Sequence, residues 1–169
     1  MEMLESKRLI FRSPEIGDAE NIYRNIVSED VYYYLPYAIP LSIKEVSDGV
    51  LKWKDHENDS YRWYIQERKG GLIGEIHYIP LPKDPLKVEF GGSIGKLFQN
   101  KGYMSEALDT TGEYLKKQGI TSIIIETDSE NVAMQITAEK NGFDFLYDYE
   151  RVSLALKVNR RIYRYEKRI

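Results

Sequence analysis

The residues with the clearest chemical potential lie in a short loop, residues 99–104 with the sequence QNKGYM, just ahead of a helical pattern. A glycine before a helix lets backbone N–H groups turn toward a ligand, and a helix N-terminus favours an anion. The loop therefore predicts a site for a phosphate-bearing molecule. Short glycine turns also occur without any ligand, so the loop alone leaves a plain turn as the alternative.

Other kinds of site are limited by the composition. The chain has no cysteine, which excludes disulfides, thiolate metal sites and a cysteine nucleophile. Its two histidines, His56 and His77, argue against a multi-histidine metal centre and a Ser-His-Asp triad. The loop is not a Walker A loop, because Lys101 precedes Gly102 and no Lys-Ser/Thr pair follows. No metal is expected.

Length and charge point to a single ordinary domain. The 169 residues predict one domain over residues 1–169, and 42% of them are hydrophobic. Lys and Arg number 24 against 27 Asp and Glu, which argues against nucleic-acid binding by bulk charge. The N-terminus lacks the apolar core of a signal peptide, and no run reaches membrane-spanning length. We therefore expect a cytoplasmic location and no membrane partner.

Hydrophobic periodicity places the loop among strands and helices. The pattern predicts strands at 7–14, 61–68, 71–81, 86–97, 121–128, 143–156 and 160–168. It predicts helices at 17–28, from Ser42 onward, at 102–119 and at 129–142, with Asp18, Ser42 and Ser129 at N-termini and Gly119 and Gly142 at C-termini. Ser42 and Glu45 make a capping box.

The order of these elements indicates the fold class. Three consecutive strands over 61–97 read as an antiparallel meander, and 121–128 reads as a strand covered on both faces. We therefore expect an α+β fold with a mixed, mostly antiparallel central sheet of about seven strands, flanked by about four helices.

Three segments in this order resemble a known family. IGEIHYI (73–79), VEFGGSIGKLFQNKGYMSEAL (88–108) and IETDSENVAMQITAEKNGF (125–143) are similar to the GNAT acetyltransferases, especially the RimJ/RimL-like branch of ribosomal-protein N-terminal acetyltransferases. The N-terminal RLIFRSPEIGDAENIY (8–23) also resembles this branch, so the likeness covers essentially the whole chain. The resemblance implies a GNAT fold and acetyl-CoA as the co-substrate.

The resemblance also implies which residues bind acetyl-CoA. The family's pyrophosphate loop corresponds to Gln99, Asn100, Lys101, Gly102, Tyr103 and Met104. The pantetheine contacts fall near Gly92 and Ile94 on the preceding strand, and at Asn131 on the second helix. Two of these residues keep plain alternatives: Lys101 as a solvated lysine, and Asn131 as a residue that satisfies the N–H groups of a helix start.

Catalytic residues are marked less clearly. Glu89 lies where this branch has a Glu-x-Gly and is the candidate general base, acting through water, with an ordinary strand carboxylate as the alternative. Glu75 and His77 are two apart on the neighbouring strand and share a face, which makes His77 a rival base that we expect to be structural. The family's thiolate protonators are replaced by Ala138 and Met134.

The resemblance leaves the acceptor open among protein N-terminal α-amines, polyamines and aminoglycoside-like molecules. The tyrosines at 32–34 and 37 lie where the family builds its acceptor wall, although they also suit a core or rim. The basic RRIYRYEKR segment (160–168) reads as the solvated face of an edge strand rather than an RNA surface.

The function expected is acetyl transfer from acetyl-CoA to a primary amine by direct attack. An acyl-CoA-binding sensor without turnover is the alternative, and an RNA- or ribosome-associated protein is a third. A homodimer is left open.

Overall fold

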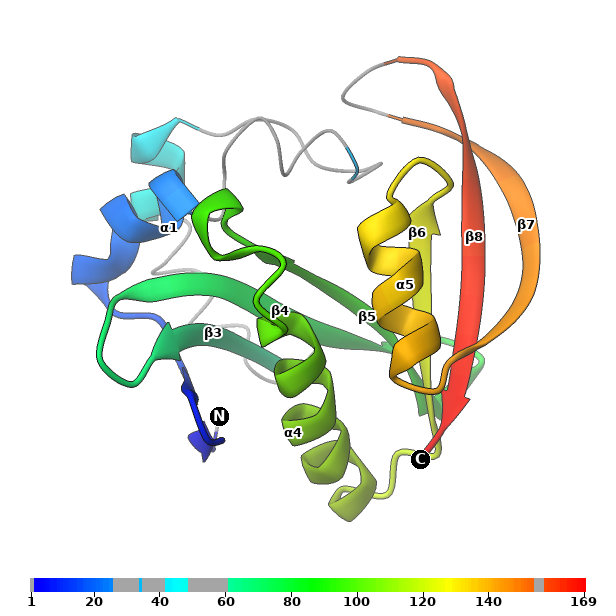
Figure 1. The fold of residues 1–169 in the computed structure, drawn as a ribbon, viewed down its shortest axis with the longest axis horizontal. Coiled ribbons are helices and arrows are strands. Elements are labelled where there is room, and N and C mark those ends of the chain that lie inside the picture. The colour runs from blue at the N-terminus through cyan, green and yellow to red at the C-terminus, as the bar shows by residue number, and fades with distance from the viewer. Residues whose placement is uncertain (1, 26–33, 35–41, 49–60, 154–156) are drawn as a thin grey trace.

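The computed structural model describes residues 2–25, 34, 42–48, 61–153 and 157–169, and its centre is one mixed β-sheet (Figure 1). The strand order is β1-β2-β3-β4-β5-β6-β8-β7. The strands are β1 (Leu4–Glu5), β2 (Leu9–Arg12), β3 (Tyr61–Glu67), β4 (Leu72–Leu81), β5 (Asp84–Ile94), β6 (Ser122–Asp128), β7 (Asp144–Val152) and β8 (Asn159–Arg168). The α-helices with assigned bounds are α1 (Ala19–Asn25), α4 (Tyr103–Lys117) and α5 (Val132–Lys140), and residues 43–48 are also helical.

The pairing follows from the connections. Short turns join β3 to β4 and β4 to β5, so these strands pair antiparallel and form the expected meander. The connection from β5 to β6 contains α4, and these two strands pair in parallel. All other neighbours in the described sheet are antiparallel, which confirms the expected α+β fold with a mixed, mostly antiparallel sheet.

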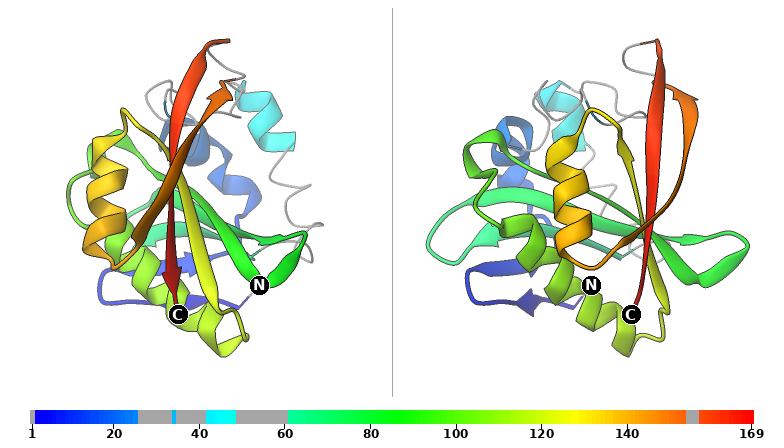
Figure 2. Two further views of the ribbon diagram at one scale, coloured as in Figure 1. Left: turned by 90° about the vertical axis from the view of Figure 1, so that its right-hand side faces the viewer. Right: turned by 45° about the vertical axis from the view of Figure 1, so that its right-hand side comes forward.

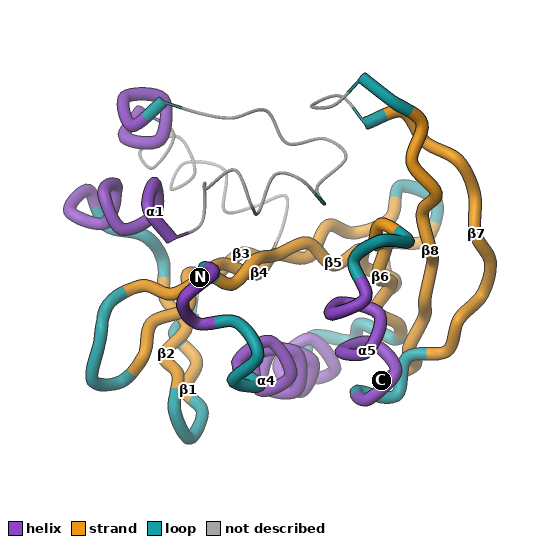
Figure 3. The backbone as a smooth tube through the Cα atoms, turned by 45° about the horizontal axis from the view of Figure 1, so that its top comes forward, coloured by secondary structure: helices purple, strands orange, loops and turns teal. Residues whose placement is uncertain are grey.

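One face of the sheet, called here the α4 face, carries α4 and α5 (Figure 3). The helix α4 buries Ala107, Leu108 and Leu115 at helical spacing against this face. The strands contribute Trp63 and Tyr78 among other side chains with no exposed surface. This is the larger apolar cluster, and it fixes α4 beneath the centre of the sheet.

The opposite face, called here the α1 face, carries α1 and the helical residues 43–48 over the N-terminal half of the sheet. Ile22 and Val46 pack there against Tyr64 and Leu72. The capping box is present, because the Ser42 N–H donates to Glu45 Oε2 at 2.7 Å. The two faces of the sheet are therefore covered by different helices.

Two details differ from the sequence expectation. The described sheet has eight strands, because the two-residue β1 also pairs with β2. The prediction that 160–168 forms an edge strand is wrong: β8 lies between β6 and β7, and β7 is the edge (Figure 1, and Figure 2, right). Ion pairs across the sheet explain the basic residues of β8, as the site shows below. No helix in the described ranges is long and apolar enough to cross a membrane.

Candidate active site

The site begins where two strands part. The parallel ladder between β5 and β6 runs from Lys87↔Ser122 to Phe90↔Ile125 and does not continue beyond that pair. Residues 91–94 of β5 stay paired with β4 on their other side. Backbone groups of these residues that face the gap therefore have no ladder partner and are available to a ligand.

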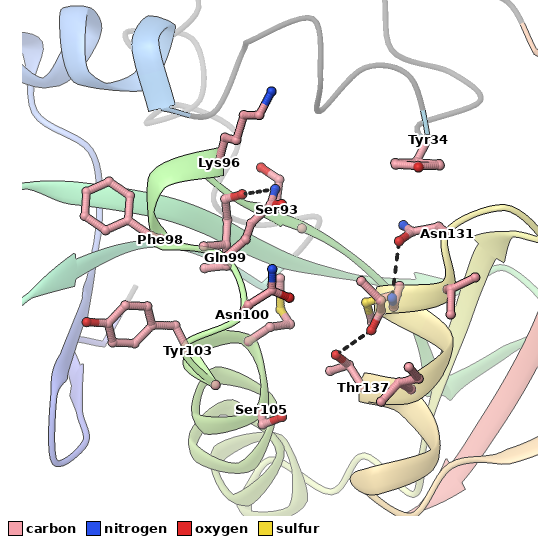
Figure 4. Close-up of a pocket in the computed structure, with 18 of the residues that line it drawn as sticks. Tyr34, Ser93, Lys96, Phe98, Gln99, Asn100, Tyr103, Ser105, Asn131 and Thr137 are labelled. Carbon is pink, nitrogen blue, oxygen red and sulfur yellow. Dashed lines mark hydrogen bonds between the residues drawn. The ribbon is translucent and has the colours of Figure 1, made fainter.

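A cleft of about 1070 Å³ opens at this split (Figure 4). It lies between the N-terminal ends of α4 and α5, and it brings together residues that are distant in the sequence. The residues named from the sequence that line it are Gly92, Ile94, Gln99, Asn100, Gly102, Tyr103, Met104 and Asn131. Lys101 is not among the lining residues, and its ammonium lies 5.3 Å from the centre of the Phe98 ring.

The loop has the backbone geometry of an anion site. Asn100 and Gly102 have φ values of 60° and 75°, so the residues immediately before and after Lys101 both have a left-handed backbone conformation. Gly102 is the N-cap of α4, and no side chain caps the helix. The N–H groups of the first turn therefore lack an internal partner and can bind negative charge, which the helix dipole also favours.

A clamp from the first hairpin holds this loop. Arg8 donates from NH1 to the Lys101 carbonyl at 2.8 Å and from Nε to Glu106 at 2.6 Å. Its guanidinium also lies 4.4 Å from the centre of the Tyr103 ring. Ser6 donates to the same Glu106 carboxylate at 2.6 Å. The turn between β1 and β2 thus fixes the start of α4 from the side away from the cleft.

Two side chains of the loop form hydrogen bonds that hold the loop in place. Gln99 donates from Nε2 to the Ile94 carbonyl at 3.0 Å, which ties the loop to the end of β5. The Tyr103 hydroxyl donates to Glu67, and its ring points away from the cleft in Figure 4. These residues therefore shape the cleft mainly through the backbone positions that they fix.

The other wall comes from α5. Asn131 is the N-cap of this helix, since its Oδ1 accepts the Met134 N–H at 3.2 Å. This is the helix-start role that the sequence left open for Asn131. The sequence expected Ser129 at the N-terminus of this helix, and the structure has Asn131 as the cap instead. Figure 4 shows the same side chain at the cleft, opposite Gln99 and Asn100. Met134 lines the cleft, whereas Ala138 is fully buried in the core.

Sequence reasoning missed Ser93, which lines the cleft between Gly92 and Ile94. Its hydroxyl is the one buried side-chain polar atom in the described residues that has no hydrogen-bond partner. A buried hydroxyl without a partner is costly, so a polar ligand in the cleft would satisfy it. Strand alternation could have placed Ser93 on the same face as Glu89, but nothing in the sequence marks it as unpaired.

Glu89 lies on the α1 face of β5, in the pair before the last pair of the parallel ladder. It is half-buried, and its carboxylate has no hydrogen bond to another described residue. Burial, and next the negative charge of Glu126, raise the pKa of Glu89 against the opposing effect of Arg164 and Arg151. Such a carboxylate is more basic than a solvated one.

Glu126 anchors an ion-pair cluster beside Glu89. Tyr149 donates to it at 2.6 Å, Arg151 at 2.7 Å, and Arg164 binds its other oxygen. Burial alone would raise the pKa of Glu126, but these three partners outweigh burial and lower it. Glu126 therefore stays ionised and acts on Glu89 as a fixed charge. Of the basic residues in 160–168, which the sequence assigned to a solvated face, Arg164 belongs to this cluster.

A second cluster lies on the neighbouring strand. Glu75 Oε2 is 3.1 Å from His77 Nδ1 and accepts from Arg62 NH1 at 3.0 Å. Burial raises the pKa of Glu75, but His77 and Arg62 together lower it to about 2. The imidazole lies across Gly91, where a Cβ would be 2.3 Å from Nε2. The sequence predicted that Glu75 and His77 share a face, and they do.

The remaining predictions about the site fall partly outside the described residues. Tyr34 lines the cleft, while Tyr32, Tyr33 and Tyr37 lie outside the part of the chain that the structure describes. Within the described ranges, no group of three or more His, Asp or Glu side chains is arranged to hold a metal ion.

Known proteins share this fold and parts of the sequence. The family model described as an acetyltransferase (GNAT) domain matches residues 8–144. The uncharacterized N-acetyltransferase YnaD of Bacillus subtilis (strain 168) is 26% identical over 140 residues, which are 82% of this chain and 81% of that protein.

Two solved structures extend the likeness to almost the full length. A GNAT-family acetyltransferase from Bacillus anthracis has a TM-score of 0.85 at 21% identity, with 99% of this chain and 98% of that one covered. RimL, a ribosomal L7/L12 α-N-protein acetyltransferase in complex with coenzyme A, has a TM-score of 0.81 at 16% identity, with 99% and 98% covered. With its family model matched over most of its length and its fold shared with RimL, the chain belongs to the GNAT acetyltransferase family, which carries out acetyl-CoA-dependent acetyl transfer.

Proposed function

We propose that this protein is an N-acetyltransferase that moves the acetyl group of acetyl-CoA to a primary amine by direct attack, within one domain formed by residues 1–169. The observation that carries the proposal is the split between β5 and β6, which opens a cleft onto the N-terminal ends of α4 and α5. RimL, whose structure contains coenzyme A, supports the proposal through its shared fold.

The cleft suits acetyl-CoA in three places. The N–H groups at 100–104 face an anion such as the pyrophosphate, with Gln99 and Tyr103 holding the loop. Backbone groups at Gly92 and the N–H of Ile94, whose carbonyl accepts from Gln99, suit the amide groups of the pantetheine arm, and Asn131 approaches from the opposite wall. Lys101 contributes charge near the loop rather than a contact inside the cleft.

Acetyl-CoA supplies an activated acyl carbon and a thiolate leaving group. The protein must position the amine and remove its protons. Glu89 suits proton removal, because its carboxylate is half-buried, free of hydrogen bonds to described residues, and raised in pKa by burial and by Glu126. We assign it as general base, acting directly or through water.

The acceptor belongs to the class of primary amines. The Tyr34 ring lines the cleft, and an aromatic ring there suits a cationic ammonium. A protein N-terminus, a polyamine and an aminoglycoside-like molecule all carry such a group. RimL acts on a protein α-amine, which makes peptide N-termini the first acceptors to test.

An acyl-CoA-binding sensor without turnover is the second candidate. Met134 lines the cleft and Ala138 is buried, at the two positions where the family resemblance leads us to expect thiolate protonators. A protein with the cofactor cleft but without proton transfer would bind acetyl-CoA and release no thiol.

Thiol release from acetyl-CoA across a panel of N-terminal peptides, polyamines and aminoglycosides separates these functions. Turnover with any amine supports the enzyme, and tight binding of acetyl-CoA without turnover supports the sensor. Glu89→Gln should lower kcat about 10²-fold or more with little change in cofactor affinity. Glu150→Gln, on the exposed edge strand, is the matched control and should keep full activity.

The phosphate loop is tested separately by calorimetry. Gly102→Pro should weaken coenzyme A binding, because proline removes an N–H and cannot adopt a φ of 75°. Gly102→Ala keeps the N–H and costs about 1 kcal/mol for the left-handed conformation, so it should bind more tightly than the proline variant. Equal affinities in the wild type and a folded Gly102→Pro variant would show that the loop does not bind the phosphates.

A further inference from the structure

We infer that His77 is a second proton acceptor in this acetyl transfer, with Glu75 as the residue that positions its ring. The inference rests on the proposed function, because it assigns a role within the same site. It departs from the sequence expectation, in which His77 is structural.

The strand register places His77 beside the split. His77 pairs with Gly91, the first residue of β5 beyond the last β5–β6 pair at Phe90↔Ile125. Glu89 pairs with Ile79, so Glu89 and His77 are diagonal neighbours on one face of two adjacent strands. The next residues of β5, Gly92 and Ser93, line the cleft. His77 therefore lies beside the cleft wall, opposite the residue that precedes Gly92.

The ring has one nitrogen engaged and one available. Nδ1 faces Glu75 Oε2 at 3.1 Å, and Glu75 is held in turn by Arg62. An ionised carboxylate accepts only, so Nδ1 carries the proton in this pair and Nε2 of the neutral ring carries a lone pair. No described residue forms a hydrogen bond with Nε2. This is the arrangement of a base whose tautomer is fixed by a carboxylate.

Gly91 determines where that lone pair lies. The ring edge crosses Gly91 so closely that a Cβ there would be 2.3 Å from Nε2 and 2.5 Å from Cε1. The imidazole thus occupies space that any other residue at position 91 would fill.

Acetylation of an ammonium group requires two proton acceptors. An ammonium that becomes an amide nitrogen loses two protons, one before attack and one as the N–C bond forms and the C–S bond breaks. We assign the first proton to Glu89, from which it passes to solvent, and the second to His77 Nε2. The electron pair of the C–S bond leaves with the sulfur, which takes up one proton, so one proton is released overall. His77 can return its proton to that sulfur, a role that Met134 and Ala138 cannot fill.

Charged groups surround His77 on three strands. In the described residues they are Arg62 on β3, Glu75 on its own strand and Glu89 on β5, with the Glu126 cluster behind Glu89. Glu75→Gln keeps a carbonyl that can accept from Nδ1 but removes the charge that holds the ring, so it tests how far the carboxylate fixes the tautomer.

Steady-state kinetics with acetyl-CoA and the amine that gives turnover test the inference. His77→Gln should lower kcat at least 10-fold and leave the KM for acetyl-CoA within about twofold. Glu75→Gln should retain more activity than His77→Gln. Glu150→Gln should change neither quantity. Melting curves confirm that each variant is folded.

Nitrogen NMR adds a readout that does not require turnover. The chain has two histidines, so a His56→Gln sample assigns the His77 signals. Near neutral pH the neutral ring should carry its proton on Nδ1, and Glu75→Gln should reduce that preference. A proton on Nε2 instead would overturn the inference.

The outcomes separate the two proposals. Wild-type turnover together with full activity of His77→Gln overturns the role of His77 and leaves the proposed function standing. Tight acetyl-CoA binding with no turnover for any amine overturns the proposed function and the role of His77 with it. Loss of activity in His77→Gln with an unchanged His77 tautomer in Glu75→Gln overturns the positioning role of Glu75.

Discussion

Replacing Gly91 by alanine moves His77 without changing His77 itself. The added Cβ would lie 2.3 Å from Nε2, whereas ordinary contact begins near 3.4 Å, so the ring must retreat by about 1 Å. The atoms that move belong to the end of a side chain, and Gly91 has no positive φ, so the fold should tolerate the change. Misplacement by 1 Å can cost about 10²-fold in rate.

We therefore expect Gly91→Ala to lower kcat by about 10-fold to 10²-fold, with a loss of unfolding free energy of about 1–3 kcal/mol, as is typical of overpacking. Thiol-release kinetics and urea denaturation measure the two quantities. Gly71→Ala is the matched control, because its Cβ would meet nothing nearer than Asn21 Nδ2 at 4.0 Å. The reasoning fails if Gly91→Ala keeps full kcat, or if Gly91→Ala with His77→Gln loses the product of the two single effects.

Three further predictions follow from the cleft, the clamp and the buried carboxylate. Acetyl-CoA at 100 times its dissociation constant should stabilise the fold by about 2.7 kcal/mol, whereas pantetheine without phosphates should raise Tm much less; equal shifts would leave the loop no role. Arg8→Ala removes the bonds to Lys101 and Glu106 and should weaken coenzyme A binding several-fold by calorimetry, with turnover at saturation largely kept. Folding lowers the pKa of Glu75 from about 4.5 to about 2, so its stabilisation is present above pH 4.5 and is lost as the pH falls toward 2. This amounts to about 3 kcal/mol, and urea denaturation of Glu75→Gln should show that much less pH dependence in this window.

Local signals in the sequence predict much of the fold. Gly119 and Gly142 do end their helices with positive φ, and in each case an N–H just beyond the glycine returns to the last turn, from Ile120 to Leu115 and from Phe143 to Ala138. The capping box at Ser42 is also formed. Such features depend on a few residues that are neighbours in the chain, so the sequence alone is enough to predict them.

Tertiary order is less visible in the sequence. The insertion of β8 between β6 and β7 is made by ladders and ion pairs, such as Arg164 with Glu126, that join residues far apart in the chain. Two-residue strands such as β1 are too short to show a period. Asp18 was expected to cap α1, but its carboxylate turns back to the Glu15 N–H and to Arg12, because the helix is preceded by a 3-10 turn.

The site divides in the same way. The loop 99–104 and the start of α5 carry local turn and cap signals, and the resemblance to GNAT enzymes gave them a ligand. The positions of Ser93 and His77 relative to the split depend on where the β5–β6 ladder stops. That point is set by packing across the whole sheet, and alternation along one strand cannot locate it.

The split also changes how the sheet should be regarded energetically. A sheet normally completes its ladder, and each polar group left without a partner and out of water costs about 1–3 kcal/mol. Here the ladder ends after four pairs, although both strands continue. The backbone N–H and C=O groups that form no ladder between β5 and β6 are then available to an extended ligand with amide groups. Such a ligand takes the place of a ninth strand, so a mutation that extended the β5–β6 pairing would stabilise the protein and close its site together.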